Sequence, residues 1–411
     1  MPNTVLTPTI VAKMAAPILE NALVMAKKVY RGYESEFAAK VNGYKAGANL
    51  TIRKPTDFTV TSGAVISAAQ DVREGSLTLS VNQQRNVSFE FTSQELTLQV
   101  DMLAERIIKP AMIQIANAIE MDLMNLYRQI PAYVGTPGNI VDSFAKFGRG
   151  PERLDQFAVM QDSRCAVLSP PDQWGLLGSQ SNLFIAGAAN GAYRDGSLGN
   201  IGGVETYMSQ NVPTHTVGAL GGTPVVAGAG QSVLYTAVMA TGTQTLNLSG
   251  WSNSIVNILR EGDVFTLANV FAVNPVTKAV LPFLRQFVVR ASIDSTAGGL
   301  TALTISPPII ISGAFQTCSA APANLAAVTV VGTAATGFRQ NMVFHKNAFA
   351  LAIVPMESPP GAVDVARESY KGVSVRIIPV YDGVNDLSRW RCDVLYGVQC
   401  IDPRLAVRLN G

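Results

Sequence analysis

The chain carries few of the side chains that enzymes use for acid–base, nucleophilic or metal chemistry. Its 411 residues include only two histidines, His215 and His345. Two histidines leave little for a catalytic triad or an imidazole metal site. No GxSxG elbow, HExxH pair or GxxxxGK[ST] loop is present either. The sequence therefore predicts no catalytic residue, no cofactor and no metal site, and a protein that is not an enzyme.

The remaining reactive or motif-like residues have structural interpretations. The four cysteines show no CxxC pair and no histidine at ligand spacing, which predicts reduced, buried thiols: Cys165, Cys318, Cys392 and Cys400. Gly228-Ala229-Gly230 begins like a dinucleotide fingerprint but lacks a third glycine, so we expect a turn. Asp364 and Glu368 have the spacing of a solvated helix face.

Charge is scarce and almost balanced along the chain. The sequence holds 31 Lys and Arg against 29 Asp and Glu, and charged residues make up 15% of it, against about 25% in average soluble domains. This balance excludes a nucleic-acid grip built on overall basicity and leaves uncharged surface for subunit interfaces. Met1–Val5 does not resemble an export signal, and apolar runs such as Phe349–Met356 are too short for a membrane span.

Six of the charged residues lie on a segment that is expected to project from the protein. Ala48–Val60 and Ser76–Phe91 read as strands, the second with a slip in its alternation, and Thr61–Gly75 between them holds few large apolar residues. We expect a long β-hairpin that acts in assembly. Its mixed charges suit pairing with a neighbouring subunit, although a solvated loop is the alternative: Arg53, Lys54, Asp57, Asp71, Arg73 and Glu74.

Two helical segments are expected before residue 131. Thr4–Gly43 contains an apolar helical face, with Pro17 in its first turn. Residues 1–54 hold eight basic and three acidic side chains, which fits either a solvated face or an arm that docks on an acidic neighbour. Thr92–Glu95 reads as a capping box before a long apolar stripe, Ile107–Ile130, in which Pro110 predicts a kink. Such a helix, about 30 residues or 45 Å long, indicates an architectural spine.

The composition changes at Pro213. From Pro213 to Gly337, 125 residues carry seven charges. Five short apolar runs predict a barrel or sandwich of strands: Val233–Met239, Thr243–Leu248, Val264–Val273, Gln286–Ile293 and Leu300–Ile305. Cys165–Ser169 before this region reads as a buried strand and Pro170–Trp174 as a helix start. After it, Asn341–Val354 is helix or strand, and Val373–Tyr381 and Trp390–Val398 form a hairpin.

Several segments, taken in order, resemble the major capsid (coat) proteins of tailed bacteriophages. Within these the chain is most similar to the podovirus type, which adds an inserted β-barrel to the Hong Kong 97-type fold. The matching segments are Arg53-Lys54-Pro55, Ile107–Ile130, Gly191–Gly196 with Gly202-Gly203, Arg260–Leu267 with Phe287–Val289 and Ile305–Pro307, and Ile377–Tyr381 through Tyr396-Gly397. The resemblance implies an α+β fold with a spine helix, an extended β-hairpin loop, a central mixed α/β domain and an inserted all-β barrel.

The implied division of the chain has six parts. They are an N-terminal arm (1–43), the extended hairpin (44–91), the spine helix and peripheral domain (92–165), the first part of the central domain (166–212), the inserted all-β domain (213–337), and the second part of the central domain with the C-terminal strands (338–411). The inserted domain would support folding of its host domain or contact neighbours across the shell.

The resemblance also implies the function and the partners. It implies a major capsid protein that self-assembles as pentamers and hexamers into an icosahedral shell around double-stranded DNA, without sequence-specific contacts to that DNA. A short arm implies a separate scaffolding protein and a procapsid, and one vertex would hold a portal protein. The location would be the virion, after assembly in the host bacterial cytoplasm, with no membrane partner. The alternatives are a non-viral β-rich binding or adhesion module and an enzyme with an unrecognised site.

Overall fold

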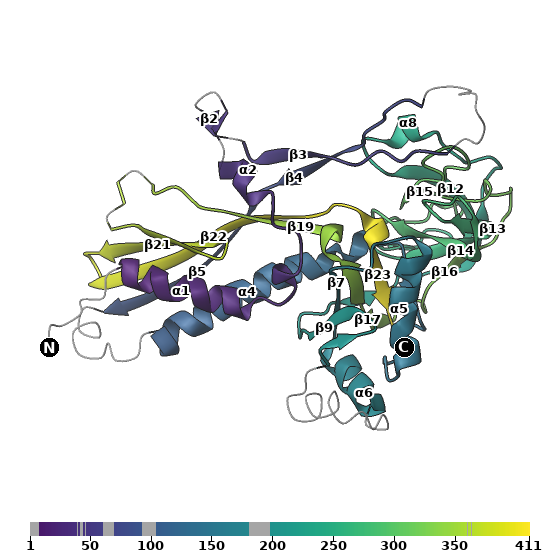
Figure 1. Cartoon of the computed structure of the whole chain (residues 1–411). Coiled ribbons are helices and arrows are strands. Elements are labelled where there is room, and N and C mark those ends of the chain that lie inside the picture. The colour runs from purple at the N-terminus through teal and green to yellow at the C-terminus, as the bar shows by residue number, and fades with distance from the viewer. Residues whose placement is uncertain are drawn as a thin grey trace. The chain divides into compact units, whose positions relative to one another are not determined.

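The structure, a computed structural model, describes residues 8–38, 40–41, 44–45, 47–60, 70–92, 104–180, 198–359, 361–362 and 364–411 (Figure 1). The chain splits into two compact units. The first comprises Met1–Leu50, Thr78–Met124 and Phe349–Gln399, and the second comprises Thr51–Leu77, Asn125–Ala348 and Cys400–Gly411. Segments far apart in the sequence thus share each unit.

The first unit combines helices with an antiparallel sheet. The helical elements are α1 (Pro8–Ala22), η1 (Met25–Lys27), α2 (Glu34–Ala38), the π-helical turn η2 (Ala104–Ile108) and α4 (Lys109–Met124). The strands run in the order β19 (Phe349–Val354), β22 (Leu387–Cys400), β21 (Val373–Asp382) and β20 (Ala366–Tyr370), and β5 (Gln83–Thr92) also pairs with β22. The predicted hairpin near the C-terminus is β21 and β22, and Glu368 lies in β20, so the helix-face interpretation of Asp364 and Glu368 was wrong.

Helix α1 packs against α4 and against strands β20 and β21 (Figure 1). Three of its six buried residues are alanines, Ala12, Ala15 and Ala16, which allow close approach to its neighbours. The expected position of Pro17 in the first turn was wrong. Pro17 lies inside α1 and Pro8 begins the helix, because tertiary packing of the alanine face outweighs the hydrogen bond that an internal proline removes.

A buried carboxylate joins the turn after α1 to α4. Glu120 is 1% exposed, and its two oxygens accept the backbone N–H groups of Val24, Met25 and Ala26 at 2.9, 3.0 and 3.0 Å. Burial raises the pKa of Glu120 above its ordinary value, although the three hydrogen bonds oppose that shift. One side chain therefore satisfies three amides at the start of η1.

Helix α4 confirms the predicted spine and its irregularity. Ala111, Ile115, Ile119 and Leu123 are buried along one stripe. The π-helical turn η2 ends two residues before Pro110, whose ring would clash with the carbonyl four residues earlier in a regular α-helix. Residues 125–129 continue as the 3-10 turn η3 (Asn125–Gln129). Within the predicted spine, regular α-helix is therefore confined to α4. The predicted capping box falls largely on residues outside the described ranges.

The strand expected at residues 76–91 is two strands. β4 (Ser76–Ser80) pairs with β3 (Asn49–Arg53), whereas β5 pairs with β22. The slip in alternation at Val81 and Asn82 marks the place where the chain leaves the hairpin, because one unpaired step redirects the side chains that follow. Strand β4 therefore ends at Ser80, and one further backbone hydrogen bond joins the Val81 amide to the Ala48 carbonyl at 2.8 Å.

A six-stranded mixed sheet forms one part of the second unit. Its order is β6 (Tyr133–Val134), β23 (Ala406–Leu409), β18 (Asn341–His345), β7 (Arg164–Leu168), β9 (Val204–Met208) and β8 (Asn200–Ile201). Helix α5 (Phe144–Gln156) contacts β23 and β18, and it also contacts α6 (Pro170–Gln180). The predicted strand Cys165–Ser169 is β7, and the predicted helix start is that of α6.

The charge-poor region forms a second, nearly closed sheet. Its order is β11 (Gly222–Val226), β12 (Gln244–Trp251), β15 (Thr301–Ser306), β14 (Val280–Val289), β13 (Val264–Val273) and β16 (Val328–Val330). A bridge between Val225 and Ala327 brings the two edge strands together, as a barrel requires. The barrel-like insertion is thus confirmed. Val233–Met239 was wrongly expected to be a strand, since it contains the short helix α8 (Tyr235–Val238).

The inserted sheet has its own core and a paired entrance. Leu246, Phe265, Phe287 and Leu303 belong to a buried cluster formed entirely from residues 226–328. The chain enters through β10 (Thr214–Thr216) and leaves through β17 (Gly337–Arg339), and these strands pair antiparallel. The two junctions therefore lie side by side, which is the arrangement that tolerated insertions share.

We predict that Pro213–Gln340, expressed alone, folds into a soluble β-rich domain, because its core and entrance ladder lie within that range. The measurement is a two-dimensional amide NMR spectrum, which should be well dispersed. An undispersed spectrum would show that the sheet depends on the rest of the chain.

We also predict that Glu120→Ala lowers the free energy of unfolding by roughly 2–4 kcal/mol, since it leaves three amides without their acceptor. Gln114→Ala, at an exposed position of the same helix, should change it by less than about 0.5 kcal/mol. Urea unfolding at neutral pH measures both variants. Equal effects would contradict the assigned role of Glu120.

Glu120 should also leave a signature in the pH dependence of stability. Its folded pKa is raised above the ordinary 4.5, so the extra stability that protonation of Glu120 gives the folded state is fully present below that pH and is lost as pH rises through the folded value. Glu120→Gln should remove this part of the pH profile. A profile unchanged by the substitution would contradict the expectation.

Candidate assembly surface and the pocket at its base

The predicted site residues lie at the end of the hairpin's strand ladder, where Arg53 is the last residue of β3, and on the two sides beyond it. One backbone hydrogen bond and several hydrogen bonds from side chains hold these sides together. The Lys54 amide donates to the Gly75 carbonyl at 2.8 Å, the Thr56 hydroxyl donates to the Arg73 carbonyl at 3.2 Å, and the Thr59 amide donates to Gln70 Oε1 at 2.9 Å. Residues 61–69 at the predicted tip lie outside the described residues.

Four of the six charged residues form two exposed ion pairs within their own chain. Arg53 Nη1 lies 3.4 Å from Glu74 Oε2, and Arg73 Nη2 lies 2.9 Å from Asp71 Oδ2. The side chains of Arg53 and Asp71 are 82% and 75% exposed. Exposed pairs contribute only about 0–1 kcal/mol each, so they can exchange partners at little cost. Pairing with a neighbouring subunit stays a prediction.

Asp57 is anchored more firmly than the other predicted residues. Its carboxylate accepts from Arg404 Nη1 at 3.1 Å, and Arg404 Nη2 donates to Asp402 at 2.8 Å. Asp402 also accepts the Arg404 amide at the start of the 3-10 turn η5 (Pro403–Leu405). Burial alone would raise the pKa of Asp402, but the charge and hydrogen bonds of Arg404 outweigh it and lower that pKa.

Exposed apolar side chains near this base were missed by the sequence analysis. Phe58, Val60 and Val72 are 56%, 99% and 69% exposed. From the sequence, Phe58 and Val60 were placed in a strand-like segment and Val72 in a loop with few large apolar residues. Isolated exposed apolar residues are common, but several on one projecting segment favour contact with another surface.

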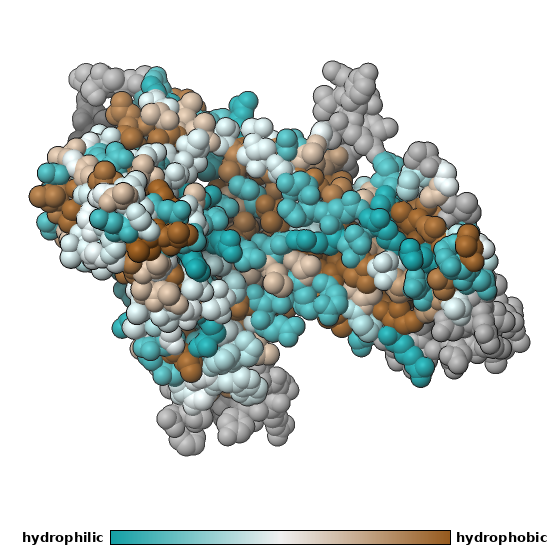
Figure 2. Space-filling view, turned by 180° about the vertical axis from the view of Figure 1, so that it is seen from behind, coloured by the Kyte–Doolittle hydropathy of each residue, from teal (hydrophilic) through white to brown (hydrophobic). Residues whose placement is uncertain are grey.

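Other apolar side chains reach the surface around the inserted sheet (Figure 2). Leu234, Val256, Val276 and Leu325 are each more than 60% exposed in this charge-poor region. Sparse charge and exposed aliphatic groups are properties of surfaces that associate.

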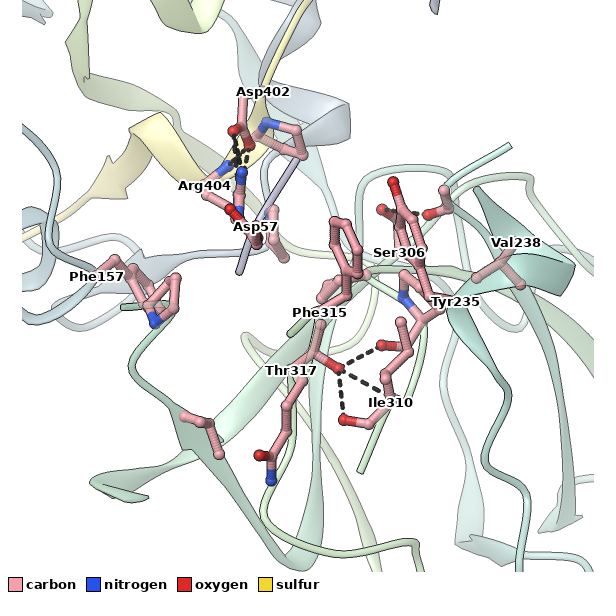
Figure 3. Close-up of a pocket in the computed structure, with 18 of the residues that line it drawn as sticks. Asp57, Phe157, Tyr235, Val238, Ser306, Ile310, Phe315, Thr317, Asp402 and Arg404 are labelled. Carbon is pink, nitrogen blue, oxygen red and sulfur yellow. Dashed lines mark hydrogen bonds and ion pairs between the residues drawn. The ribbon is translucent and has the colours of Figure 1, made fainter. Parts of the chain in front are cut away.

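A cavity of about 160 Å³ lies at the base of the hairpin, within the second unit. Figure 3 shows Asp57 and the Asp402–Arg404 pair at one side and Tyr235, Phe315, Ser306 and Thr317 at the other. Its walls come from the hairpin, from Phe157 directly after α5, from several parts of the inserted region and from the C-terminal segment. No local sequence motif could have indicated a pocket built from such distant segments.

The pocket walls fit closely against the hairpin. The rings of Tyr235 and Phe315 stack with centroids 3.5 Å apart. A Cβ atom at Gly75 would lie 3.0 Å from both the Met239 carbonyl oxygen and the Tyr235 hydroxyl, so glycine allows the hairpin to approach α8 closely. The Thr317 hydroxyl donates to the Pro308 carbonyl at 2.6 Å and orients the opposite wall.

Within the part of the chain that the structure describes, no group of three or more His, Cys, Asp or Glu side chains could hold a metal ion. No helix among the described residues is long and apolar enough to cross a membrane. The four cysteines are buried and form no disulfide among the described residues, as expected, and burial raises the pKa of the Cys392 and Cys400 thiols to about 12. Gly228 and Gly230 have positive φ angles in a loop, as a turn requires.

The comparison with protein families decides the identity. The model of the family described as P22 coat protein, gene protein 5, matches residues 3–411. The chain belongs to this family. A curated major capsid protein of Acyrthosiphon pisum secondary endosymbiont phage 1 is 22% identical over 417 residues, covering 98% of this chain and 97% of that protein. The resemblance to phage coat proteins is thereby confirmed, and the chain is a capsid protein of the virion.

Solved phage structures are also similar to the chain. A chain of Mycobacterium phage Che8 has a TM-score of 0.48 and 13% identity, covering 94% of this chain and 91% of its own length. The mature capsid of bacteriophage PhiM1 gives a TM-score of 0.43 and 12% identity, with 89% and 82% covered. Family membership rules out the non-viral adhesion module, and membership of a structural family favours the absence of enzyme activity.

We predict that Arg404→Gln releases the base of the hairpin, because Arg404 is the partner of both Asp57 and Asp402. Amide hydrogen exchange of residues 53–60 should become faster, while the melting temperature falls by only a few degrees. Arg389→Gln removes an exposed pair with Glu90 and serves as the control, with exchange at the hairpin unchanged. Unchanged exchange in Arg404→Gln would contradict the anchoring role.

Proposed function

We propose that this capsid protein assembles as hexamers and pentamers into the icosahedral shell that encloses the double-stranded DNA of a tailed phage. The observation that carries the proposal is the hairpin, whose exposed apolar and charged side chains extend beyond an anchored base. Such a segment buries little on its own subunit and gains most from a neighbouring surface. In the proposal, Arg53, Lys54, Asp57, Asp71, Arg73 and Glu74 are the contact candidates at that interface.

The composition supports a shell made of many moderate contacts. Heterologous contacts that close generate rings, and weak contacts repeated over many copies become strong through effective concentration. A net charge of +2 suits a wall that must not bind packaged DNA tightly, because affinity for DNA rises with each phosphate that Lys or Arg neutralises. Contacts with the DNA are proposed to be independent of sequence.

The remaining partners follow from the same proposal. A separate scaffolding protein directs assembly of a procapsid. A portal protein occupies one vertex, and assembly takes place in the cytoplasm of the host bacterium. The inserted domain, residues 213–337, supports folding of its host domain or contacts neighbouring subunits across the shell.

Expression of the chain with and without the products of its neighbouring genes tests the proposal. Electron microscopy should show closed shells of uniform size when the scaffolding protein is present, and irregular shells or tubes when it is absent. Only dispersed monomers under both conditions would contradict it.

We predict that reversing charges on the hairpin impairs assembly and spares folding. Arg53→Glu and Glu74→Lys should each reduce particle yield, while the melting temperature of the subunit stays nearly unchanged because the pair between them is exposed. Sedimentation separates particles from subunits and gives the yield.

The paired reversal distinguishes an internal role from a docking role. Arg53→Glu combined with Glu74→Lys restores the ion pair within the hairpin. If the hairpin docks on a neighbour, yield stays low in this double variant, since the neighbour still meets the reversed charges. Normal yield from every single reversal between Arg53 and Glu74 would show that the hairpin is a passive loop.

A further inference from the structure

One wall of the pocket at the base of the hairpin contains a buried arginine with an unsatisfied nitrogen. Arg285 lies in β14, lines the cavity and is 6% exposed. Among the described residues, no acceptor pairs with its Nε. Its guanidinium carbon lies 5.3 Å from the centre of the Phe157 ring. A buried charge with an unsatisfied donor is costly, so an acceptor bound at this site would be stabilising.

The other charges of the pocket do not neutralise Arg285. The lining includes four cationic side chains and two carboxylates: Lys54, Lys278, Arg285 and Arg404 against Asp57 and Asp402. Both carboxylates are bound to Arg404. Lys278 Nζ donates to the carbonyls of Pro275 and Ala314. The cavity therefore carries an excess of positive charge, and burial lowers the pKa of Arg285 because its charge is poorly compensated there.

The rest of the cavity is suited to an apolar group. Phe157, Tyr235, Phe315 and Ile310 contribute to its walls (Figure 3). The volume of about 160 Å³ is close to that of cavities, roughly 150 Å³, that accept a benzene ring. An aromatic ring or a branched aliphatic group of similar size fits this space.

We propose that the pocket binds a carboxylate attached to an apolar body about the size of a benzene ring, with the guanidinium of Arg285 receiving the carboxylate. A guanidinium and a carboxylate form charge-assisted, often bidentate hydrogen bonds. The apolar body displaces water from the aromatic walls. The carboxylate comes either from a small organic acid or from another copy of this chain, which would place an Asp or Glu side chain and an adjacent apolar side chain in the pocket together.

A matched pair of arginines makes the proposal testable. Arg153 lies 3.5 Å from the centre of the Phe283 ring, and the Phe157 and Phe283 rings meet edge to face at 5.9 Å. The two arginines thus share a stacked environment, but Arg285 lines this cavity and Arg153 lines a different one. Arg285→Met removes the carboxylate partner, whereas Arg153→Met removes an equivalent cation elsewhere.

Titration of the full-length, unassembled subunit with benzoate, followed by calorimetry, is the experiment. Benzoate should bind saturably. Benzamide has the same shape without the charge, so its affinity should be lower by about tenfold or more. Arg153→Met should bind benzoate like the unchanged chain, and Arg285→Met should lose at least tenfold in affinity. Absence of saturable binding, or equal affinity for benzoate and benzamide, overturns the proposal even if Arg285→Met fails to fold.

Assembled shells distinguish the two sources of the carboxylate. Binding of benzoate to shells as well as to subunits assigns the site to a small organic acid. Binding to subunits but not to shells, together with loss of assembly in Arg285→Met, assigns it to a side chain of a neighbouring copy. The comparison with assembled shells rests on the proposed assembly, whereas the titration of subunits does not. Failure of benzoate binding and failure of assembly therefore give different results.

Discussion

The second unit depends on one buried carboxylate, Asp263, at the entrance to the inserted sheet. Asp263 is 1% exposed. One of its oxygens lies 2.7 Å from Nε2 of His215 on β10, and the other accepts the amides of Arg260 and Gly218 at 2.7 and 3.1 Å. Nδ1 of His215 lies 3.0 Å from the hydroxyl of Tyr127. A fully satisfied buried network of this kind fixes one arrangement of the elements it joins.

A buried arginine extends the same constraint to the C-terminal strand. Arg408 on β23 is 1% exposed and donates to the carbonyls of Ile130 and Gly262 at 2.8 and 2.7 Å. Burial lowers its pKa to about 10. Gly262 adjoins Asp263, so the turn before β13 is held from both sides. In a chain with few charges, the buried ones mark the places where separate segments must meet, and the entrance to the insertion is one such place.

The sequence predicted elements whose signal is local. Val264–Val273 was placed as a strand with the bounds that β13 has, because alternation and flanking turns are both short-range. The kink predicted from Pro110 corresponds to the π-helical turn η2 before α4. Pro17 and Val233–Met239 were misjudged, because packing of an alanine face and of α8 overrides local preference.

The candidate site was predictable only in part. The charged residues of the hairpin could be found because they follow one another in the sequence. Their partners could not: Arg404 lies 347 positions from Asp57, and Arg285 meets Phe157 only through the fold. A pocket that draws on the hairpin, the insertion and the C-terminal segment has no signature in any one of them. Phe58 and Val60 follow an alternation that buried strands also show, so their exposure could not be predicted from the sequence.

The central claim is that the hairpin is an assembly element held at its base and completed by a neighbour. Cryo-electron microscopy of shells assembled from the full chain tests it most directly. Residues 53–75 should lie against an adjacent subunit, with Asp57 still paired to Arg404 of its own chain. A reconstruction in which this segment contacts only its own subunit, or projects into solvent, would contradict it.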